Sequence, residues 1–445
     1  MLGLERSKRL WARKEPSRIR KRPPLPGSGS CLLAGRVSRT QMVEVGALQY
    51  QSQLGAKVSY SQRPSIARLF VSFLRLGATA FGGPSMVVYI RRLAVDKKHW
   101  LDVDAFADGV ALAQMVPGAT AMQTAAYVGL KARGVIGAAA SYLGFGLPAF
   151  LLMMIFAAGY ARTSDLPAVV SAFSGLQAVI VAVVAGATLA FGKTTLKGWK
   201  SAVLAGAAAA LFGLRVNPVL VILLAAAGGL MVIKPRQADS SHPALPTRGF
   251  PYRTPLLVIL SASAVGFLVL FFLDRTLFNL AILLSRIDLL AFGGGFASLP
   301  LMLHEIVEAR HWIDGRAFMN GIILGQVTPG PIVITATFIG YLMAGPLGGI
   351  VATIAIFLPS FVVIVGLSPC FDRLRTSAAF TRIIGGVLCS FVGLLLTVTV
   401  RFALNVHWDL PHLVLAGGAL AALLLKVDIL YVVAVATVLS VVMFA

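Results

Sequence analysis

Apolar segments long enough to cross a lipid bilayer follow one another from Pro64 to the C-terminus of this chain. A helix needs about 20 residues to cross the hydrocarbon layer. Hydrophobic residues make up 58% of the 445 residues and charged residues only 13%, a balance outside the range of soluble globular domains. Because polar backbone groups find no water inside a bilayer, these segments must fold as helices. We therefore expect an all-α polytopic membrane protein.

The apolar pattern predicts about thirteen transmembrane helices. The expected spans are roughly 64–90, 104–130, 135–160, 168–191, 201–214 and 217–233, and then 255–273, 276–302, 317–343, 346–367, 381–402, 411–425 and 428–444. Each half contains two short spans. An alternative interpretation makes each short pair a single re-entrant element.

The predicted domain organisation has four parts. Residues 1–63 are basic and polar and are expected to form a disordered cytoplasmic tail, unless translation begins at Met42. Residues 64–234 are expected to form a first repeat, and 235–254 a polar linker. Residues 255–445 are expected to form a second repeat with one extra leading helix.

The net charge of +22 is unevenly distributed, since 14 of the 39 Lys and Arg lie in residues 1–68 and many others lie in short gaps between apolar segments. This is the positive-inside pattern, which places the N-terminus in the cytoplasm and requires no nucleic acid partner. The three cysteines form no Cys-x-x-Cys pair, and Gly186–Thr194 has the wrong spacing for a phosphate-binding loop. We expect no metal and no cofactor.

The two halves of the chain contain the same residues in the same order. At an offset of 211 positions, Arg75, Phe81, Gly82 and Gly83 recur as Arg286, Phe292, Gly293 and Gly294. At an offset of 212, Gln114, Pro117 and Gly118 recur as Gln326, Pro329 and Gly330. One unmatched span, 255–273, separates the halves and reverses the orientation of everything after it. The repeats are therefore expected to be inverted.

The loop charges support inverted repeats in part. The loop with Lys131 and Arg133 would face the cytoplasm, whereas its counterpart at 343–346 is uncharged. The loop with Arg91 and Arg92 disagrees, because it would face outward. Either the first helix is re-entrant or these cations serve a purpose there.

Each half places an arginine inside an apolar helix. Arg75 lies about 16 Å into its expected helix at 1.5 Å per residue, too deep to reach the membrane surface easily. Such an arginine costs at least about 2.5 kcal/mol unless water or a partner compensates. Asp288 is a poor partner for Arg286, because side chains two residues apart point to different faces of a helix. Backbone carbonyls could satisfy one such arginine, but recurrence in both halves favours a function.

Glycine- and proline-rich breaks interrupt two helices of each half. Close helix packing or a simple kink would explain any one of them. Four breaks in paired positions instead match secondary transporters, in which discontinuous helices meet near the bilayer midplane. In those proteins the positive N-terminal ends of half-helices point at the substrate. The breaks therefore predict a substrate site between the two repeats.

Arginines and helix N-termini together select an anion. Guanidinium groups suit the oxygens of a tetrahedral oxyanion, and glutamine amides can donate further hydrogen bonds. The predicted site consists of Arg75, Phe81, Gly82, Gly83, Pro84, Gln114, Pro117, Gly118, Arg286, Phe292, Gly293, Gly294, Gly295, Gln326, Pro329 and Gly330. Asp96 and Glu308 occupy matching positions and keep an acid in both halves, so they are the candidates for coupling transport to an ion gradient.

The ordered motifs resemble those of the chromate ion transporter family in its long form with two fused halves. The first series reads Phe81–Pro84, Trp100-Leu101, Gln114–Gly118, Gly134–Gly137 and Leu147–Phe150, and the second reads Phe292–Gly295, Trp312-Ile313, Gln326–Gly330, Gly345–Gly348 and Leu358–Phe361. The resemblance covers about residues 64–445. Gly295 stands where the first half has Pro84, and Pro331 stands where it has Ala119, so the two half-sites are not equivalent.

The resemblance implies a secondary active transporter, not an enzyme, that exports chromate across the bacterial inner membrane and confers chromate resistance. The membrane potential or the proton gradient would drive export. Sulfate has the same shape and charge as chromate, so uptake or exchange of sulfate or another oxyanion is an alternative. A non-transporting membrane sensor or scaffold is a second alternative. The expected partners are the oxyanion and the lipid bilayer, and a homodimer is left open.

Overall fold

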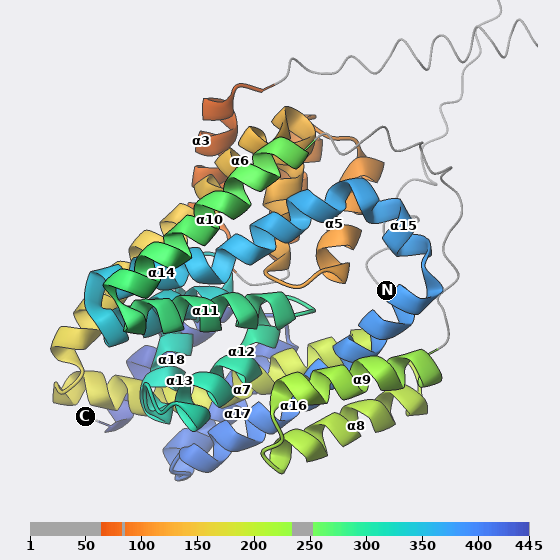
Figure 1. The fold of residues 1–445 in the computed structure, drawn as a ribbon. Coiled ribbons are helices and arrows are strands. Elements are labelled where there is room, and N and C mark those ends of the chain that lie inside the picture. Colours follow the sequence, from red (N-terminus) through yellow and green to blue (C-terminus); the bar gives the residue numbers. More distant parts are fainter. Residues whose placement is uncertain (1–63, 82–84, 234–251, 445) are drawn as a thin grey trace, which may run out of the picture. The chain divides into compact units, whose positions relative to one another are not determined.

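The computed structural model describes residues 64–81, 85–233 and 252–444 (Figure 1). These residues belong to one compact unit, Tyr60–Ala445. The predicted tail at 1–63 and nearly all of the predicted linker lie outside the described residues, as do Gly82, Gly83 and Pro84. The tail and the linker therefore stay predictions.

The described residues of the first half form seven α-helices and one π-helix. In chain order these are α3 (Ile66–Thr79), α4 (Ser85–Arg91), the π-helix η1 (Arg92–Lys97), α5 (Val103–Met115), α6 (Thr120–Thr163), α7 (Pro167–Thr195), α8 (Trp199–Gly213) and α9 (Pro218–Val232). The helix α10 (Arg253–Leu273) follows and buries none of its residues within the protein, as expected of an apolar helix that faces lipid.

The second half repeats this order. Its elements are α11 (Arg275–Leu290), η2 (Gly295–Ala297), α12 (Ser298–Met302), the π-helix η3 (Leu303–Ala309), α13 (Gly315–Val327), η4 (Ile332–Ile334), α14 (Thr335–Leu367), η5 (Ser368–Cys370), α15 (Phe371–Thr376), α16 (Ala378–Asn405), α17 (Leu410–Leu424) and α18 (Ile429–Phe444). Every regular element in the described part of the chain is helical, which confirms the all-α fold class.

The structural repeat extends to unusual backbone conformations. A positive φ is uncommon for residues other than glycine. His99 and His311 have φ of 50° and 52°, and Arg215 and Lys426 have φ of 64° and 66°. The members of these pairs are 212 and 211 positions apart, the same offsets as those of the sequence motifs. The two halves therefore share one fold.

The helices α6 and α14 each reverse direction within their length. The reversals lie at Gly134, with φ of 68°, and at Gly345, with φ of 61°. In α6, the Ser141 hydroxyl donates a hydrogen bond of 2.7 Å to the Ala125 carbonyl, sixteen residues earlier. The two arms of α6 therefore lie side by side.

Every predicted span corresponds to one helix, one helical arm or one broken pair of helices. The span 64–90 is interrupted between α3 and α4, and the span 104–130 between α5 and α6. Among the described residues, five helical segments are long and apolar enough to cross a bilayer: those containing α6, α7, α10, α14 and α16. The helices α8, α9, α17 and α18 have 15, 15, 15 and 16 residues, fewer than the roughly 20 needed. They pack as two short hairpins, of which α8 and α9 are clearly visible in Figure 1.

Aspartates begin the equivalent helices α5 and α13. Asp102 accepts a 2.6 Å hydrogen bond from the Ala105 amide, and Asp314 accepts one of the same length from the Ala317 amide. Such a cap satisfies a free amide, complements the helix dipole and stabilises a helix by about 1 kcal/mol. Because α5 and α13 both end at a Pro-Gly break, these caps fix where the helices that lead into the breaks begin.

Candidate functional site

The four breaks meet in pairs that join the two halves. The Gly118 amide donates a hydrogen bond of 2.9 Å to the Ala291 carbonyl, and the Gly330 amide donates one of 3.1 Å to the Ala80 carbonyl. Ala80 and Ala291 are equivalent positions of the repeat, as are Gly118 and Gly330. Each half therefore contributes its second break to the first break of the other half.

The glycines at the breaks adopt conformations that other residues rarely adopt. Gly118 and Gly330 have φ of 115° and 120°, and Gly293 and Gly294 have φ of 94° and 102°. A side chain at any of these positions would be strained. The backbone conformation at the breaks therefore requires glycine at these four positions.

The remaining break residues lie in or beside the same region. Pro117 and Pro329 are buried, and Phe81 and Phe292 are half-buried. Pro117 and Phe292 also pair as an isolated antiparallel bridge. Gly295 begins the short helix η2.

Both Pro-Gly breaks lead directly into the start of a helix. The helix α6 begins after Ala119 and η4 begins after Pro331, and neither start has a side-chain cap. The first amides of a helix lack partners within it, and the helix dipole makes this end positive. The two starts therefore suit a negatively charged ligand.

Glutamines beside the breaks carry buried polar atoms that find no hydrogen-bond partner among the described residues. These atoms are Gln326 Nε2 and Gln123 Oε1. Gln123 Nε2 donates a hydrogen bond of 2.6 Å to the Pro117 carbonyl. The Gln114 side chain is exposed. Sequence reasoning selected Gln114 and Gln326 but missed Gln123, which has no glutamine at the matching position of the second half and so lies outside the repeated motif.

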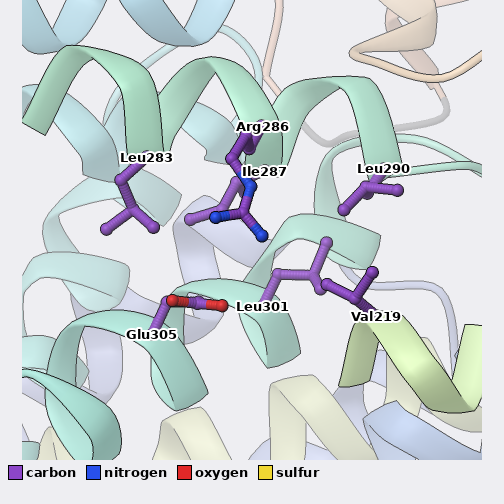
Figure 2. A pocket seen from close by; sticks show the side chains of 7 residues that line it. All are labelled: Val219, Leu283, Arg286, Ile287, Leu290, Leu301 and Glu305. Atoms are coloured by element: carbon purple, nitrogen blue, oxygen red, sulfur yellow. The ribbon is translucent and has the colours of Figure 1, made fainter. Parts of the chain in front are cut away.

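The two predicted arginines occupy equivalent positions on α3 and α11. Both side chains are exposed, and neither forms an ion pair with another described residue. Figure 2 shows Arg286 and Glu305 approaching one small cavity of about 10 Å³ from α11 and η3. The other residues around it are Val219, Leu283, Ile287, Leu290 and Leu301. A role of these arginines in binding substrate stays a prediction.

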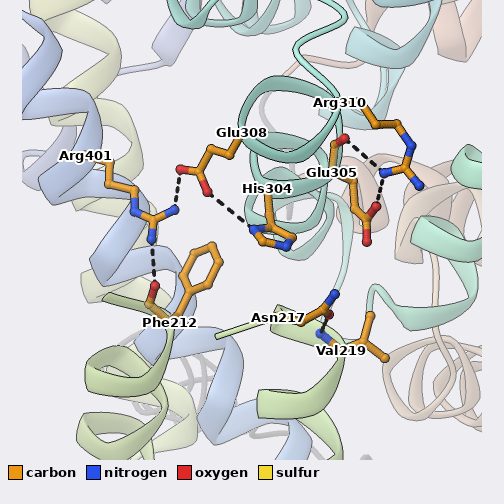
Figure 3. Close-up of polar contacts among 8 residues, drawn as sticks. All are labelled: Phe212, Asn217, Val219, His304, Glu305, Glu308, Arg310 and Arg401. Atoms are coloured by element: carbon orange, nitrogen blue, oxygen red, sulfur yellow. Dashed lines mark hydrogen bonds and ion pairs between the residues drawn. The ribbon is translucent and has the colours of Figure 1, made fainter. Parts of the chain in front are cut away.

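The two coupling candidates have different surroundings. Asp96 is exposed on the π-helix η1. Glu308, on the π-helix η3, forms an ion pair with Arg401 and lies 3.4 Å from His304 Nδ1 (Figure 3). Arg401 also donates a hydrogen bond of 2.6 Å to the Phe212 carbonyl. These contacts join η3 to α16 and α8.

The pKa of Glu308 reflects this network. Partial burial opposes ionisation, but the hydrogen bond with His304 and the positive charge of Arg401 outweigh it and lower the pKa of Glu308 below its ordinary value. Arg401 aligns with Ala190 in the first half. The network therefore belongs to one half, which the search for repeated residues could not reveal.

A third acid lies inside the protein next to a break. Asp288 is 1% exposed and accepts hydrogen bonds of 2.7 Å from both the amide and the hydroxyl of Ser360. Arg286, two residues earlier on the same helix, is exposed, as expected for side chains that point to different faces. Sequence reasoning considered Asp288 only as a partner for Arg286. Ser360 is the unassigned residue of the Leu358–Phe361 motif.

This arrangement defines a class of protein: a polytopic membrane protein of two homologous repeats whose discontinuous helices meet at paired breaks. A family model described as "Chromate transporter" matches residues 67–230 and again residues 278–441. The chain therefore belongs to the chromate transporter family. The two matches begin and end 211 positions apart, in agreement with the sequence repeat.

The chain is also similar to individual members of this family and to a further transporter. It is 40% identical over 385 residues to an uncharacterized transporter of Methanocaldococcus jannaschii, with 86% of this chain and 96% of that protein covered. It is 30% identical over 369 residues to a chromate transport protein of Pseudomonas aeruginosa, a match that covers 80% of this chain and 86% of that protein. It is 29% identical over 363 residues to a chromate transport protein of Cupriavidus metallidurans, a match that covers 81% of this chain and 88% of that protein. No solved structure matches the chain.

Proposed function

We propose that this protein is a secondary active transporter that exports chromate across the bacterial inner membrane and so confers chromate resistance. The observation that carries the proposal is the pairing of breaks between the halves, because each Pro-Gly break brings an uncapped helix start to the junction. Two relatives that align over most of the chain are named chromate transport proteins. Transport of this kind involves no chemical change of the substrate.

In the proposed site, the helix starts after Ala119 and Pro331 attract the oxyanion and the glutamines donate hydrogen bonds. The unpaired donor Nε2 of Gln326 supports this role, because a buried amide without a partner is costly unless a ligand or water satisfies it. Arg75 and Arg286 supply positive charge along the path to and from this site. Phe292 to Gly295 form a break that allows the backbone to approach the anion, and the matching motif Phe81 to Pro84 is predicted to do the same.

We propose that Asp96 and Glu308 take part in coupling at the two π-helices. Glu308 links η3 to α16 through Arg401, so a change in its charge would loosen one element against the other. The equivalent π-helix η1 presents Asp96 to solvent. Their common position in the repeat favours a matched role in the two halves.

We propose inverted repeats with the N-terminus in the cytoplasm. Arg133 Nε donates a hydrogen bond of 2.6 Å to the Pro64 carbonyl, so the start of α3 and the reversal of α6 lie on the same side of the protein. That side carries Lys131 and Arg133, and basic residues favour the cytoplasmic side.

Transport of labelled chromate into membrane vesicles of defined orientation, with sulfate as competitor, tests this proposal. We expect saturable transport that enters inside-out vesicles and is competed only weakly by sulfate. Transport in right-side-out vesicles with stronger competition by sulfate would favour the alternative, uptake or exchange of sulfate or another oxyanion. Absence of flux for both anions would favour a non-transporting sensor or scaffold.

A further inference from the structure

Asp288 is an acid within the helical bundle that has no cationic partner among the described residues. Its carboxylate is satisfied by the amide and hydroxyl of Ser360 alone, each at 2.7 Å. An ionised carboxylate that is removed from water and has no cation beside it is costly. Such a group readily takes up a proton.

Within the described residues, the elements packed against α11 bring no positive charge to this carboxylate. The helix α14 contains no charged residue, α12 contains none, and α10 carries only Arg253 at its first position. From α6, Tyr142 interacts electrostatically with Asp288, but its hydroxyl donates to the Phe357 carbonyl at 2.7 Å.

Nearby charged groups of α11 and η3 are directed elsewhere. Arg286 and Glu305 line the small cavity on another face of α11 (Figure 2). Glu305 forms an ion pair with Arg310, and His304 lies against Glu308 (Figure 3). None of these groups neutralises Asp288 in the described part of the chain.

A short series of contacts connects Asp288 to the paired breaks. A Cβ atom at Gly118 would lie only 1.8 Å from Ser360 Oγ, so this hydroxyl lies directly against the Pro-Gly break. Gln123 Nε2 lies 3.5 Å from the Ser360 carbonyl. The Ala291 amide, which follows Asp288 by three residues, donates to the Asp288 carbonyl at 3.2 Å. Ser360 therefore stands between the acid and the place where the halves meet.

The acid occurs in one half of the repeat. Asp288 aligns with Gly77, where a Cβ atom would lie 2.2 Å from the Phe145 carbonyl. Ser360 aligns with Ala149. Because the first half builds the same fold without an acid or a hydroxyl at these positions, the fold itself does not require the pair.

We propose, on the basis of the transport function proposed above, that Asp288 binds a proton together with the oxyanion. An anion at the breaks would repel an ionised Asp288, so anion and proton binding favour each other. The carboxylate takes up one proton on the side where the anion enters and releases the same proton where the anion leaves. One proton and one divalent anion carry one net negative charge, so an inside-negative potential still drives export.

The test uses the full-length protein in liposomes with labelled chromate, at alkaline pH on both sides so that chromate stays divalent, and with the membrane potential clamped to zero. An imposed pH difference should make the wild-type protein accumulate chromate on the more alkaline side. The variant Asp288→Asn keeps an acceptor oxygen for Ser360 and mimics the protonated acid. This variant should still exchange chromate but should no longer accumulate it. The chromate concentrations on the two sides of the membrane should then become equal. The control Asp165→Asn, at an exposed loop acid, should retain both.

Accumulation by Asp288→Asn equal to that of the wild-type protein would overturn this role. If Asp288→Asn purifies as the wild-type protein does but loses both chromate exchange and chromate accumulation, this role is also overturned. Asp288 would then be needed for the structure of the transporter and not for proton coupling. If the wild-type protein exchanges chromate but ignores the pH difference, the role of Asp288 fails and the transport function stands. If the wild-type protein exchanges no chromate, the transport function itself fails.

Discussion

At Gly118 there is no room for any side chain. Its φ of 115° is strained for other residues, and a Cβ atom would meet Ser360 Oγ at 1.8 Å. Its amide also donates the hydrogen bond of 2.9 Å to the Ala291 carbonyl that joins the halves. Backbone geometry, packing and the contact between repeats therefore all depend on this glycine.

We predict that Gly118→Ala loses most chromate transport and lowers the free energy of unfolding. The strained backbone alone costs about 1–2 kcal/mol, and the clash with Ser360 adds to it. Flux in liposomes and thermal unfolding in detergent measure the two effects. The matched control is Gly159→Ala, at a helical glycine with open space around it, which should behave as the wild-type protein does. Normal flux in Gly118→Ala would contradict the assigned junction.

Glu308 supports a prediction on stability. Glu308→Gln removes the negative partner of Arg401, whose side chain is only 17% exposed. A charged group left without its partner costs about 1–3 kcal/mol, so the melting temperature should fall. The double variant Glu308→Gln, Arg401→Gln should lose less than the sum of the two single changes. Strict additivity would indicate that the pair does not couple.

The same residue predicts a dependence on pH. Because the pKa of Glu308 is lowered in the folded protein, its contribution to stability is present above its unfolded pKa and is lost as the pH falls through the folded value. The stability difference between the wild-type protein and Glu308→Gln should therefore be largest near neutral pH and shrink in acid. A difference that grows in acid would have the wrong sign.

At the scale of elements, the sequence predicts the turns within α6 and α14 as the loops with Lys131 and Arg133 and at 343–346, and the structure places the reversals there. Gly134 and Gly137 were noted as a repeated motif, but the motif does not reveal which glycine turns the chain. The structure assigns the turn to Gly134, with positive φ, and close packing to Gly129 and Gly137, where a Cβ atom would lie 2.1 and 2.4 Å from the facing carbonyl.

The reversal leads to a contrast between two alanine variants. Gly134→Ala meets no atom within 4 Å, so it should lose only the cost of the backbone strain, about 1–2 kcal/mol. Gly129→Ala must separate the two arms of α6 and should be destabilised more strongly. Thermal unfolding of the two variants side by side measures this difference. Equal losses would contradict the close packing of the arms.

At the scale of the whole molecule, features that occur in both halves could be predicted from the sequence, whereas contacts that occur in only one half could not. Repeated residues identified the breaks, the two halves and the unmatched helix α10, because symmetry appears as recurrence at a fixed offset. Asp288 with Ser360 and Arg401 with Glu308 depend on contacts between segments far apart in sequence. A repeat search discards such residues, since the first half has Gly77 and Ala190 in place of Asp288 and Arg401.

The measurement that tests the account most directly is flux of labelled chromate through the purified protein in liposomes, compared with Arg75→Ala and Arg286→Ala. The wild-type protein should give saturable flux, and each of these two variants should lower its rate or its affinity, whereas Arg316→Ala, at an exposed arginine on α13, should not. No chromate flux above that of empty liposomes, or wild-type rate and affinity in both arginine variants, would contradict the account.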